Sequence, residues 1–378
     1  MPHYKFDQIA YNITDKKMPE PGDEKMYIGL EHLDSGSLKV TRWGSEVELK
    51  GQKLVMKKGD VLFGRRNTYL RRAAIAPHDG IFSAHGMIFR PKTEVIDSEY
   101  FPFFISSNYF MDAAIRISVG SLSPTVNWKT LKELEFDIPS LDEQRKNARM
   151  LAAINETKEA YQELLLQTDN LVKSQFIEMF KYINHDEYKT LDDVCILITD
   201  GTHNPPKFVE SGIPFILVSN ITGNIVTYET PKYITENDYR VLMKRTPIEK
   251  GDVLLSTVGS YGHPAIVTED RPFAFQRHIA HLKPNRDLLT SEYLHAAILS
   301  SIVQEQIEIL ILGVAQKTLN LSAIRQIKIP VPSIEEQNVF VSFVEQSDKS
   351  KFELKEAIKS CDALMKAILF TNLEEKED

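Results

Sequence analysis

The sequence has few cysteines, no long apolar run and no net positive charge, and each absence narrows the class of protein. The two cysteines, Cys195 and Cys361, are isolated and show no metal-ligand spacing, so we interpret both as buried, reduced thiols and expect a cytoplasmic protein. No stretch approaches the roughly 18–20 apolar residues that a membrane helix needs, and residues 1–5 do not resemble a signal peptide. We therefore predict no association with membranes.

The net charge of −8 argues against a uniformly basic nucleic-acid-binding protein, but the charges are distributed unevenly. Residues 51–92 hold nine Lys and Arg against two Asp and Glu, and residues 239–286 hold eight against four. Residues 334–378 hold six against eleven, and we interpret the last five residues, 374–378, as a solvated tail. Two separate regions are therefore compatible with DNA binding, whereas the end of the chain is not.

Catalytic signatures are also missing from the sequence. It contains no GxxxxGK[ST] phosphate loop, no obvious nuclease carboxylate pair and no histidines at helical ligand spacing, so we predict neither a catalytic centre nor a metal site. Asn204-Pro205-Pro206 resembles the loop of amino-methyltransferases, but those loops require an aromatic residue next, and here Lys207 follows. A DNA methyltransferase therefore remains only a weaker alternative.

An internal repeat organises the chain. Residues 120–144 align with residues 313–337 at an offset of 193, and seven of these 25 positions are identical. Lys-Gly-Asp-Val-Leu occurs at 58–62 and again at 250–254, in the same order relative to the longer match. Matches in a conserved order indicate a tandem duplication of a unit of about 190 residues.

Each unit ends in a predicted long helix, at about 141–182 and about 334–372. Ser140 and Ser333 precede acidic residues, as expected of helix N-caps, and each helix should run about 50–60 Å. Apolar residues follow a heptad spacing, which predicts two antiparallel helices that pack as a modest coiled coil. Lys158 and Lys351 interrupt this seam, and we interpret them as leaving room for protein partners. The predicted seam consists of Leu151, Ile154, Tyr161, Leu165, Val172, Met179, Val344, Leu354, Ile358, Met365 and Ile368.

In the rest of each unit, the sequence predicts hairpins that begin at the Lys-Gly-Asp turns. Short helices are predicted to follow, at 99–117 in the first copy and 292–312 in the second. The predicted fold is therefore α+β, with tandem-duplicated globular domains separated by the two long helices. The predicted boundaries are 1–140 for the first domain, 141–182 for the first helix, 183–333 for the second domain, and 334–378 for the second helix and acidic tail.

The two copies diverge most after the Val-Leu of each hairpin. The first copy continues with residues rich in Arg, which bind phosphate or guanine, and the second with small and hydroxyl residues. We interpret the shared Lys-Gly-Asp turns as scaffold and the divergent tips, with neighbouring loops, as DNA-binding. The candidate DNA-binding residues are Arg65, Arg66, Asn67, Tyr69, Arg71, Arg72, Ser121, Ser123, Thr125, His203, Lys207, Ser256, Thr257, Ser260, Tyr261, Arg277, His278 and Lys317.

Residues 199–207, Thr-Asp-Gly-Thr-His-Asn-Pro-Pro-Lys, with Gly-Ile-Pro-Phe at 212–215, open the second domain. Together with the duplicated turns and the helix entries at 138–144 and 331–337, they resemble the specificity subunits of type I restriction–modification systems. The resemblance covers nearly the whole chain, but the first domain lacks the Asp-Gly-x-His element. Its contacts with DNA are therefore less well defined than those of the second domain.

This resemblance implies a non-catalytic DNA-specificity subunit in which each domain reads one half of a bipartite target. The helices would set the gap between the halves and dock two methylation subunits, which bind S-adenosylmethionine and methylate adenine. Two restriction subunits, using ATP and Mg²⁺, would join the same core, so this chain itself would bind double-stranded DNA and no cofactor. Alternatives are the recognition subunit of a two-chain type II restriction enzyme or of a related phage-defence complex.

Overall fold

A computed structural model describes residues 2–183, 187–311 and 317–371, and the chain divides into two units. Unit 1 comprises residues 1–162 and 355–378, and unit 2 comprises residues 163–354. Gly313 of the repeat and the tail at 374–378 lie outside the described residues. Within the described ranges, no helix combines the length and the apolarity needed to cross a lipid bilayer.

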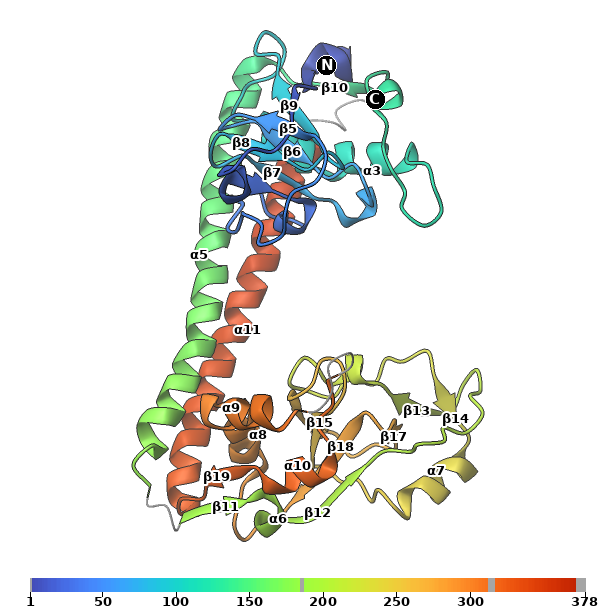
Figure 1. The fold of residues 1–378 in the computed structure, drawn as a ribbon, viewed down its shortest axis with the longest axis vertical. Helices are drawn as coiled ribbons and strands as arrows, with labels where there is room; N and C mark the ends of the chain where they lie inside the picture. Colours follow the sequence, from blue (N-terminus) through green and yellow to red (C-terminus); the bar gives the residue numbers. More distant parts are fainter. Residues whose placement is uncertain (1, 184–186, 312–316, 372–378) are drawn as a thin grey trace. The chain divides into compact units, whose positions relative to one another are not determined.

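Unit 1 contains two four-stranded sheets, with the strand orders β2-β9-β6-β7 and β3-β5-β8-β4, and a separate pair of β1 with β10 (Figure 1). The strands are β1 (His3–Lys5), β2 (Ala10–Ile13), β3 (Lys16–Lys17), β4 (Tyr27–Ile28), β5 (Lys53–Met56), β6 (Val61–Phe63), β7 (Ala73–Ile75), β8 (Gly80–Phe82), β9 (Met87–Pro91) and β10 (Glu135–Asp137). Every residue of β6 is buried because this strand lies inside its sheet and is covered on both faces.

Short helices complete unit 1. They are α1 (Phe6–Ile9), α2 (Phe101–Ser106), α3 (Asn108–Arg116) and α4 (Trp128–Leu131), with 3-10 turns η1 (Asp23–Met26), η2 (Leu30–His32) and η3 (Thr68–Leu70). Ser107 separates α2 from α3 and accepts a hydrogen bond from the backbone N–H of Phe110, 3.2 Å away, as an N-cap. The core is largely aromatic: the ring centroid of Phe6 lies 5.1 Å from that of Phe89 and 5.0 Å from that of Phe110.

Unit 2 repeats this plan, with the sheets β12-β18-β15-β16 and β14-β13-β17 and the pair β11-β19. Its strands are β11 (Tyr188–Thr190), β12 (Cys195–Asp200), β13 (Ile213–Ile216), β14 (Tyr233–Ile234), β15 (Val253–Ser256), β16 (Pro264–Ile266), β17 (Ala274–Phe275), β18 (Ile279–Pro284) and β19 (Lys328–Pro330). Its helices are α6 (Leu191–Val194), α7 (Glu236–Met243), α8 (Ser291–Leu299), α9 (Ser301–Leu310) and α10 (Leu321–Gln326), with the 3-10 turn η5 (Val218–Asn220).

The duplication predicted from the sequence is confirmed, as is the α+β class. Strands β6 and β7 correspond to β15 and β16, and both hairpins form as predicted. The predicted short helices at 99–117 and 292–312 are α2 with α3 and α8 with α9. Cys361 is buried and Cys195 is half-buried; both thiols are free, and burial raises the pKa of Cys195 to about 12.

The two long helices also form as predicted, as α5 (Leu141–Phe180) and α11 (Ile334–Thr371), and they pack together (Figure 1). Each begins with a reciprocal capping interaction. Ser140 donates its backbone N–H to the Glu143 carboxylate at 2.9 Å, and Ser333 does the same to Glu336 at 3.0 Å. Every residue of the predicted seam is buried or half-buried.

Lys158 and Lys351, which interrupt the predicted seam, each form an ion pair with the opposite helix. In unit 1, Lys158 Nζ lies 2.6 Å from Asp362, and in unit 2, Lys351 Nζ lies 3.1 Å from Asp169. Both the lysines and the aspartates are related by the offset of 193, so the repeat places the same interhelical ion pair in each unit. Each lysine pairs with an aspartate of the opposite helix and so helps to hold the helices together. The prediction that the helices also accept protein partners stays a prediction.

Candidate nucleic-acid interface

In unit 1, the candidate DNA-binding residues converge on the tip of the β6–β7 hairpin and the loop at 119–126. The backbone N–H of Val126 donates to the Arg65 carbonyl at 2.9 Å, and that of Asn67 donates to the Pro124 carbonyl at 2.7 Å. Asn67 and Arg71 adopt left-handed backbone conformations, with φ of 55° and 49°, which non-glycine residues rarely do. This tip is therefore held in a specific shape by its neighbouring loop.

The four arginines of the tip fall into two pairs. Arg72 donates to the backbone carbonyl of Leu30 at 3.0 Å, and Arg71 forms an ion pair with Asp112. Neither Arg65 nor Arg66 has a carboxylate partner among the described residues; Arg66 instead donates to the Ser123 hydroxyl at 3.3 Å, and the buried Arg65 Nε has no acceptor there. The structure thus leaves Arg65 and Arg66 as the cations available to phosphate or base edges.

The remaining unit 1 candidates lie on the same tip and loop. Tyr69 and Ser121 are exposed, whereas Ser123 and Thr125 are half-buried, and the Thr125 hydroxyl donates to the Ser123 carbonyl at 2.9 Å. Leu122, which was not among the predicted contact residues, lies between Ser121 and Ser123 and is 96% exposed. An apolar side chain this exposed at a loop tip is a candidate to contact a DNA groove, but a single leucine gives no sequence signal for it.

In unit 2, the corresponding tip is joined to its loop in the same way: the Leu319 N–H donates to the Thr257 carbonyl at 2.9 Å. Ser256 and Thr257 are buried, and the Ser256 hydroxyl accepts from the His263 N–H at 3.0 Å. These two hydroxyl residues support the tip rather than present an accessible surface. Ser260, in contrast, is exposed.

Tyr261 and Lys317 form a small polar network beside this tip. The Tyr261 hydroxyl donates to Glu308 at 2.9 Å, and Lys317 Nζ donates to the same hydroxyl at 3.3 Å. Lys317 remains exposed. The glutamate offsets part of the positive charge of Lys317 at this edge of unit 2.

The other unit 2 candidates border a hollow of about 300 Å³ beside the tip. It is lined by His203, Thr257, Arg277, His278 and Asn320, among others. The segments that supply them are far apart in the sequence: the turn after β12, the hairpin tip, the turn before β18, and the start of α10. Lys207 is exposed on the loop that follows His203.

The Asp-Gly-Thr-His segment has a local physical explanation. A Cβ on Gly201 would lie 2.3 Å from the carbonyl oxygens of Phe275 and Gln276, so only glycine fits against this backbone. The Asp200 carboxylate lies 2.7 Å from Nε2 of His203 and forms an ion pair with Arg245. Asp200 therefore fixes the position of His203 at the edge of the hollow.

The Asn-Pro-Pro sequence in this loop does not form a base-stacking site. Phe208 follows it closely but packs edge to face on the buried Phe215, with ring centroids 5.2 Å apart. The Lys232 ammonium also lies over this ring, 4.9 Å from its centroid. The aromatic ring nearest to Asn-Pro-Pro is thus already used in packing.

The duplicated Lys-Gly-Asp turns are scaffold, as the sequence indicated. Asp60 is buried and accepts from Arg90 at 2.8 and 2.9 Å. Its counterpart Asp252 is fully buried, lies 2.7 Å from Nε2 of His281 and is 3.4 Å from Lys283 Nζ. Each buried carboxylate is therefore paired with hydrogen-bonding or cationic side chains of its own unit.

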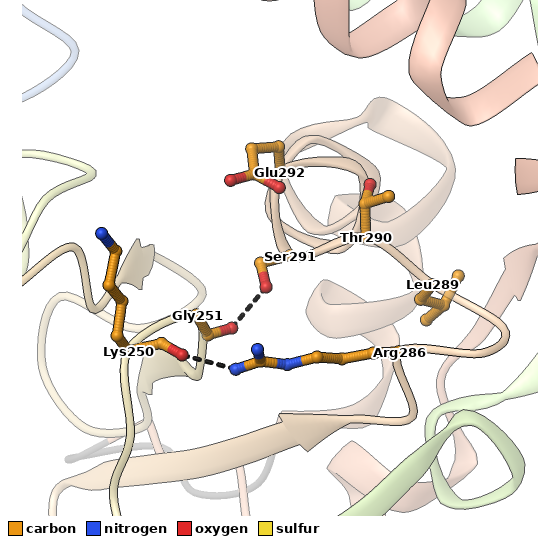
Figure 2. Close-up of a pocket in the computed structure, with 7 residues that line it drawn as sticks. All are labelled: Lys250, Gly251, Arg286, Leu289, Thr290, Ser291 and Glu292. Atoms are coloured by element: carbon orange, nitrogen blue, oxygen red, sulfur yellow. Dashed lines mark hydrogen bonds between the residues drawn. The ribbon is translucent and has the colours of Figure 1, made fainter. Parts of the chain in front are cut away.

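Figure 2 shows the hollow at the opposite end of β15 from the tip, with a volume of about 420 Å³. Here Arg286 donates to the Lys250 carbonyl, and the Ser291 hydroxyl donates to the Gly251 carbonyl (Figure 2). Gly251 has φ of +89°, and a Cβ there would lie 2.8 Å from the Arg286 guanidinium. These contacts join the turn at 250–251 to the segment that begins α8. The hydrogen bonds of Arg286 and Ser291 therefore have a structural role.

The fold thus contains two equivalent α+β units with long helices, and comparison with known proteins identifies its family. The family model described as the type I restriction modification DNA specificity domain matches residues 12–166 and 186–360. The chain therefore belongs to the type I restriction–modification DNA specificity family.

Relatives with assigned names agree with this family. The specificity subunit of the type I restriction enzyme EcoBI from Escherichia coli is 26% identical over 292 residues, which span 68% of this chain and 61% of that protein. The putative type I restriction enzyme MjaX specificity subunit from Methanocaldococcus jannaschii is 22% identical over 376 residues, which span 90% of this chain and 81% of that protein.

Solved structures show the same fold. A chain from work on complex assembly and conformational transition of the type I R-M system matches with a TM-score of 0.57 and 18% identity, covering 100% of this chain and 98% of that chain. The type I restriction–modification S subunit from M. genitalium matches with a TM-score of 0.51 and 15% identity, covering 100% and 96%.

Proposed function

We propose that this chain is the DNA-specificity subunit of a type I restriction–modification complex and acts on DNA in the cytoplasm. Unit 1 and unit 2 each read one half of a bipartite target. The helices α5 and α11 set the gap between the two halves and dock two methylation subunits. The chain contributes recognition and no catalytic group: the methylation subunits hold S-adenosylmethionine, and two restriction subunits supply ATP- and Mg²⁺-dependent translocation and cleavage.

One observation carries this proposal: the same hairpin and loop framework recurs in both units with different side chains at its tip. The backbone bond from Val126 to Arg65 recurs as the bond from Leu319 to Thr257. The tip of unit 1 presents Arg65 and Arg66, whereas unit 2 places Arg277 beside a smaller tip. Two copies of one reader with different contact chemistry suit a target whose halves differ in sequence.

A domain exchange tests the proposal. Residues 183–333 are replaced by the second domain of another family member, the chain is expressed with its methylation subunit, and methylated adenines are mapped across the cell's DNA. We expect one half-site to change while the other half-site and the gap stay as they were. A change in both half-sites, or in neither, would contradict the assignment of one half-site to each unit.

A further inference from the structure

Arg277 lies where the second unit brings three separate segments together. It precedes β18, is exposed, and borders the 300 Å³ hollow with His203 and His278. Its backbone N–H donates to the Thr202 carbonyl at 3.1 Å, which joins this turn to the Asp-Gly-Thr-His segment. The backbone position of Arg277 is therefore fixed even though its side chain reaches solvent.

Arg277 differs from the other arginines of unit 2 in what holds its side chain. Four of them form ion pairs with carboxylates: Arg240 with Glu236, Arg245 with Asp200, Arg271 with Glu269, and Arg325 with Asp192. Arg286 donates to the Lys250 carbonyl. Among the described residues, Arg277 has no carboxylate partner, and its guanidinium bonds only to His278, from Nε to the ring Nε2 at 3.2 Å. Its charge is therefore not neutralised within the unit.

The contact with His278 defines the chemical state of that ring. A guanidinium has only donors, so Nε2 of His278 must accept, and the ring proton must lie on Nδ1 of a neutral imidazole. Burial, the neighbouring Arg277 charge and His203 all lower the pKa of His278 from its ordinary value, in the direction that this arrangement requires. His278 thus orients the guanidinium plane without neutralising its charge.

This arrangement occupies Nε of Arg277 and leaves both terminal nitrogens, Nη1 and Nη2, without partners among the described residues. Two parallel donors in a fixed plane match the O6 and N7 acceptors of guanine in the major groove. A phosphate can accept the same two donors, but it would do so for every DNA sequence and with a stronger dependence on salt, so sequence discrimination separates the two contacts. We propose that Arg277, positioned by neutral His278, reads a guanine in the half-site of unit 2, an inference that rests on the proposed function.

The test uses the full chain with its methylation subunit, and methylated adenines are mapped by sequencing. Arg277→Ala should relax one G·C position in the half-site of unit 2, lowering discrimination there about 10-fold or more, and should leave the half-site of unit 1 unchanged. Arg277→Lys should relax the same position, because it keeps the charge but loses the planar pair of donors. Arg240→Ala is the matched control, since Arg240 is exposed but paired, and it should leave the target sequence unchanged.

His278 is tested as a positioning residue by a double-mutant comparison. His278→Ala should lower discrimination at the same G·C position less than Arg277→Ala does, and the double variant should be no worse than Arg277→Ala alone. Relaxation at a different position, or additive losses, would overturn the positioning role.

Two results would overturn the guanine assignment itself. If Arg277→Ala weakens binding equally for all sequences and reduces the salt slope by about one, the residue contacts phosphate. If neither the target sequence nor the affinity changes, Arg277 does not contact DNA. Failure of the proposed function gives a separate result, because the unaltered chain would then direct no sequence-specific methylation at all.

Discussion

The tips of the two hairpins share a backbone framework but differ in where their cations come from. In unit 1, the candidate cations lie on the tip itself, as Arg65 and Arg66. In unit 2 the tip is small, and Arg277, which has no carboxylate partner among the described residues, comes from the turn before β18. A duplicated scaffold thus fixes where the proposed DNA contacts can be displayed. It leaves the choice of residue, and even of the loop that supplies it, free to diverge.

The two interiors diverge as well. The strand register pairs Leu62 with Ile88 in unit 1 but Leu254 with His281 in unit 2. The second unit therefore buries an imidazole beside Asp252 where the first has only an aliphatic side chain. The two cores thus differ at an equivalent position, so equivalent substitutions in the two units test which features they share.

The largest expected effect is on DNA binding, and it should distinguish Arg65 and Arg66 from Arg71 and Arg72. Replacing Arg65 and Arg66 by Ala should weaken DNA binding by the complex on the order of 100-fold and lower the salt slope by about two, because each phosphate neutralised contributes about 0.9 to that slope. Binding is measured by fluorescence anisotropy between 50 and 200 mM salt.

The matched control is the double replacement of Arg71 and Arg72 by Ala. These side chains bond to Asp112 and the Leu30 carbonyl, so their loss should destabilise unit 1 and leave the salt slope unchanged. If the two double variants lower the slope equally, all four arginines contact DNA, and the distinction drawn between the pairs is wrong.

How far the sequence predicted this structure depends on the range of the interactions. The repeat and the heptads are periodic, so they predicted both long helices, the duplication and the paired hairpins. Which arginines of the tip are free could not be predicted, because the groups that engage Arg71 and Arg72 are Asp112 and the Leu30 carbonyl, about 40 residues away in the sequence. Arg277 was predicted as a DNA contact, but its link to His278 depends on a side-chain geometry that the sequence does not specify.

The hydroxyl residues at the tip of unit 2 also could not be placed from the sequence. Ser256 and Thr257 were candidates because hydroxyls suit DNA, yet both side chains are buried in the free chain. β15 extends through Ser256, which lies opposite Ile279 of β18, and the backbone of Thr257 just beyond it bonds to His278 and Leu319, so both residues are enclosed by contacts distant in the sequence. Lys158 and Lys351 are a further case, since their partners Asp362 and Asp169 are defined only once the two helices are placed in register.

A second, smaller effect is a loss of stability that should be equal in the two units when an equivalent buried glutamine is replaced. Gln144 is fully buried; its amide donates to the Val95 and Pro139 carbonyls at 3.0 and 2.8 Å and accepts from the Asp97 N–H at 2.6 Å. The equivalent Gln337 makes the same three kinds of bond. Its partners are the Leu288 and Pro332 carbonyls and the Thr290 N–H.

Replacing either glutamine by Ala leaves buried backbone groups without partners, so each variant should lose about 2 kcal/mol of stability. Hydrogen exchange measures this loss at α2 and α3 for Gln144→Ala and at α8 and α9 for Gln337→Ala. Gln167→Ala is the control, because among the described residues that exposed side chain bonds only to Glu163 on its own helix. A loss confined to one unit would show that the repeated bonds are not equivalent in energy.

The smallest effect is a loss of stability at low pH in unit 2 that the equivalent position of unit 1 should not produce. Burial lowers the pKa of His295 on α8 to about 4, below its ordinary value of 6.5, whereas the equivalent position in unit 1 is Pro102. The unfolded chain therefore binds this proton first, so the contribution to stability is complete above pH 6.5 and falls as the pH drops toward 4. Between pH 7.5 and 5.5, unit 2 should lose about 1 kcal/mol, seen as faster hydrogen exchange in α8 and α9 after correction for intrinsic rates. His295→Leu should abolish most of that loss, while α2 and α3 serve as the internal reference; His278, whose pKa burial also lowers, accounts for a smaller remainder. A loss that persists in full in the variant would assign the pH dependence to another group.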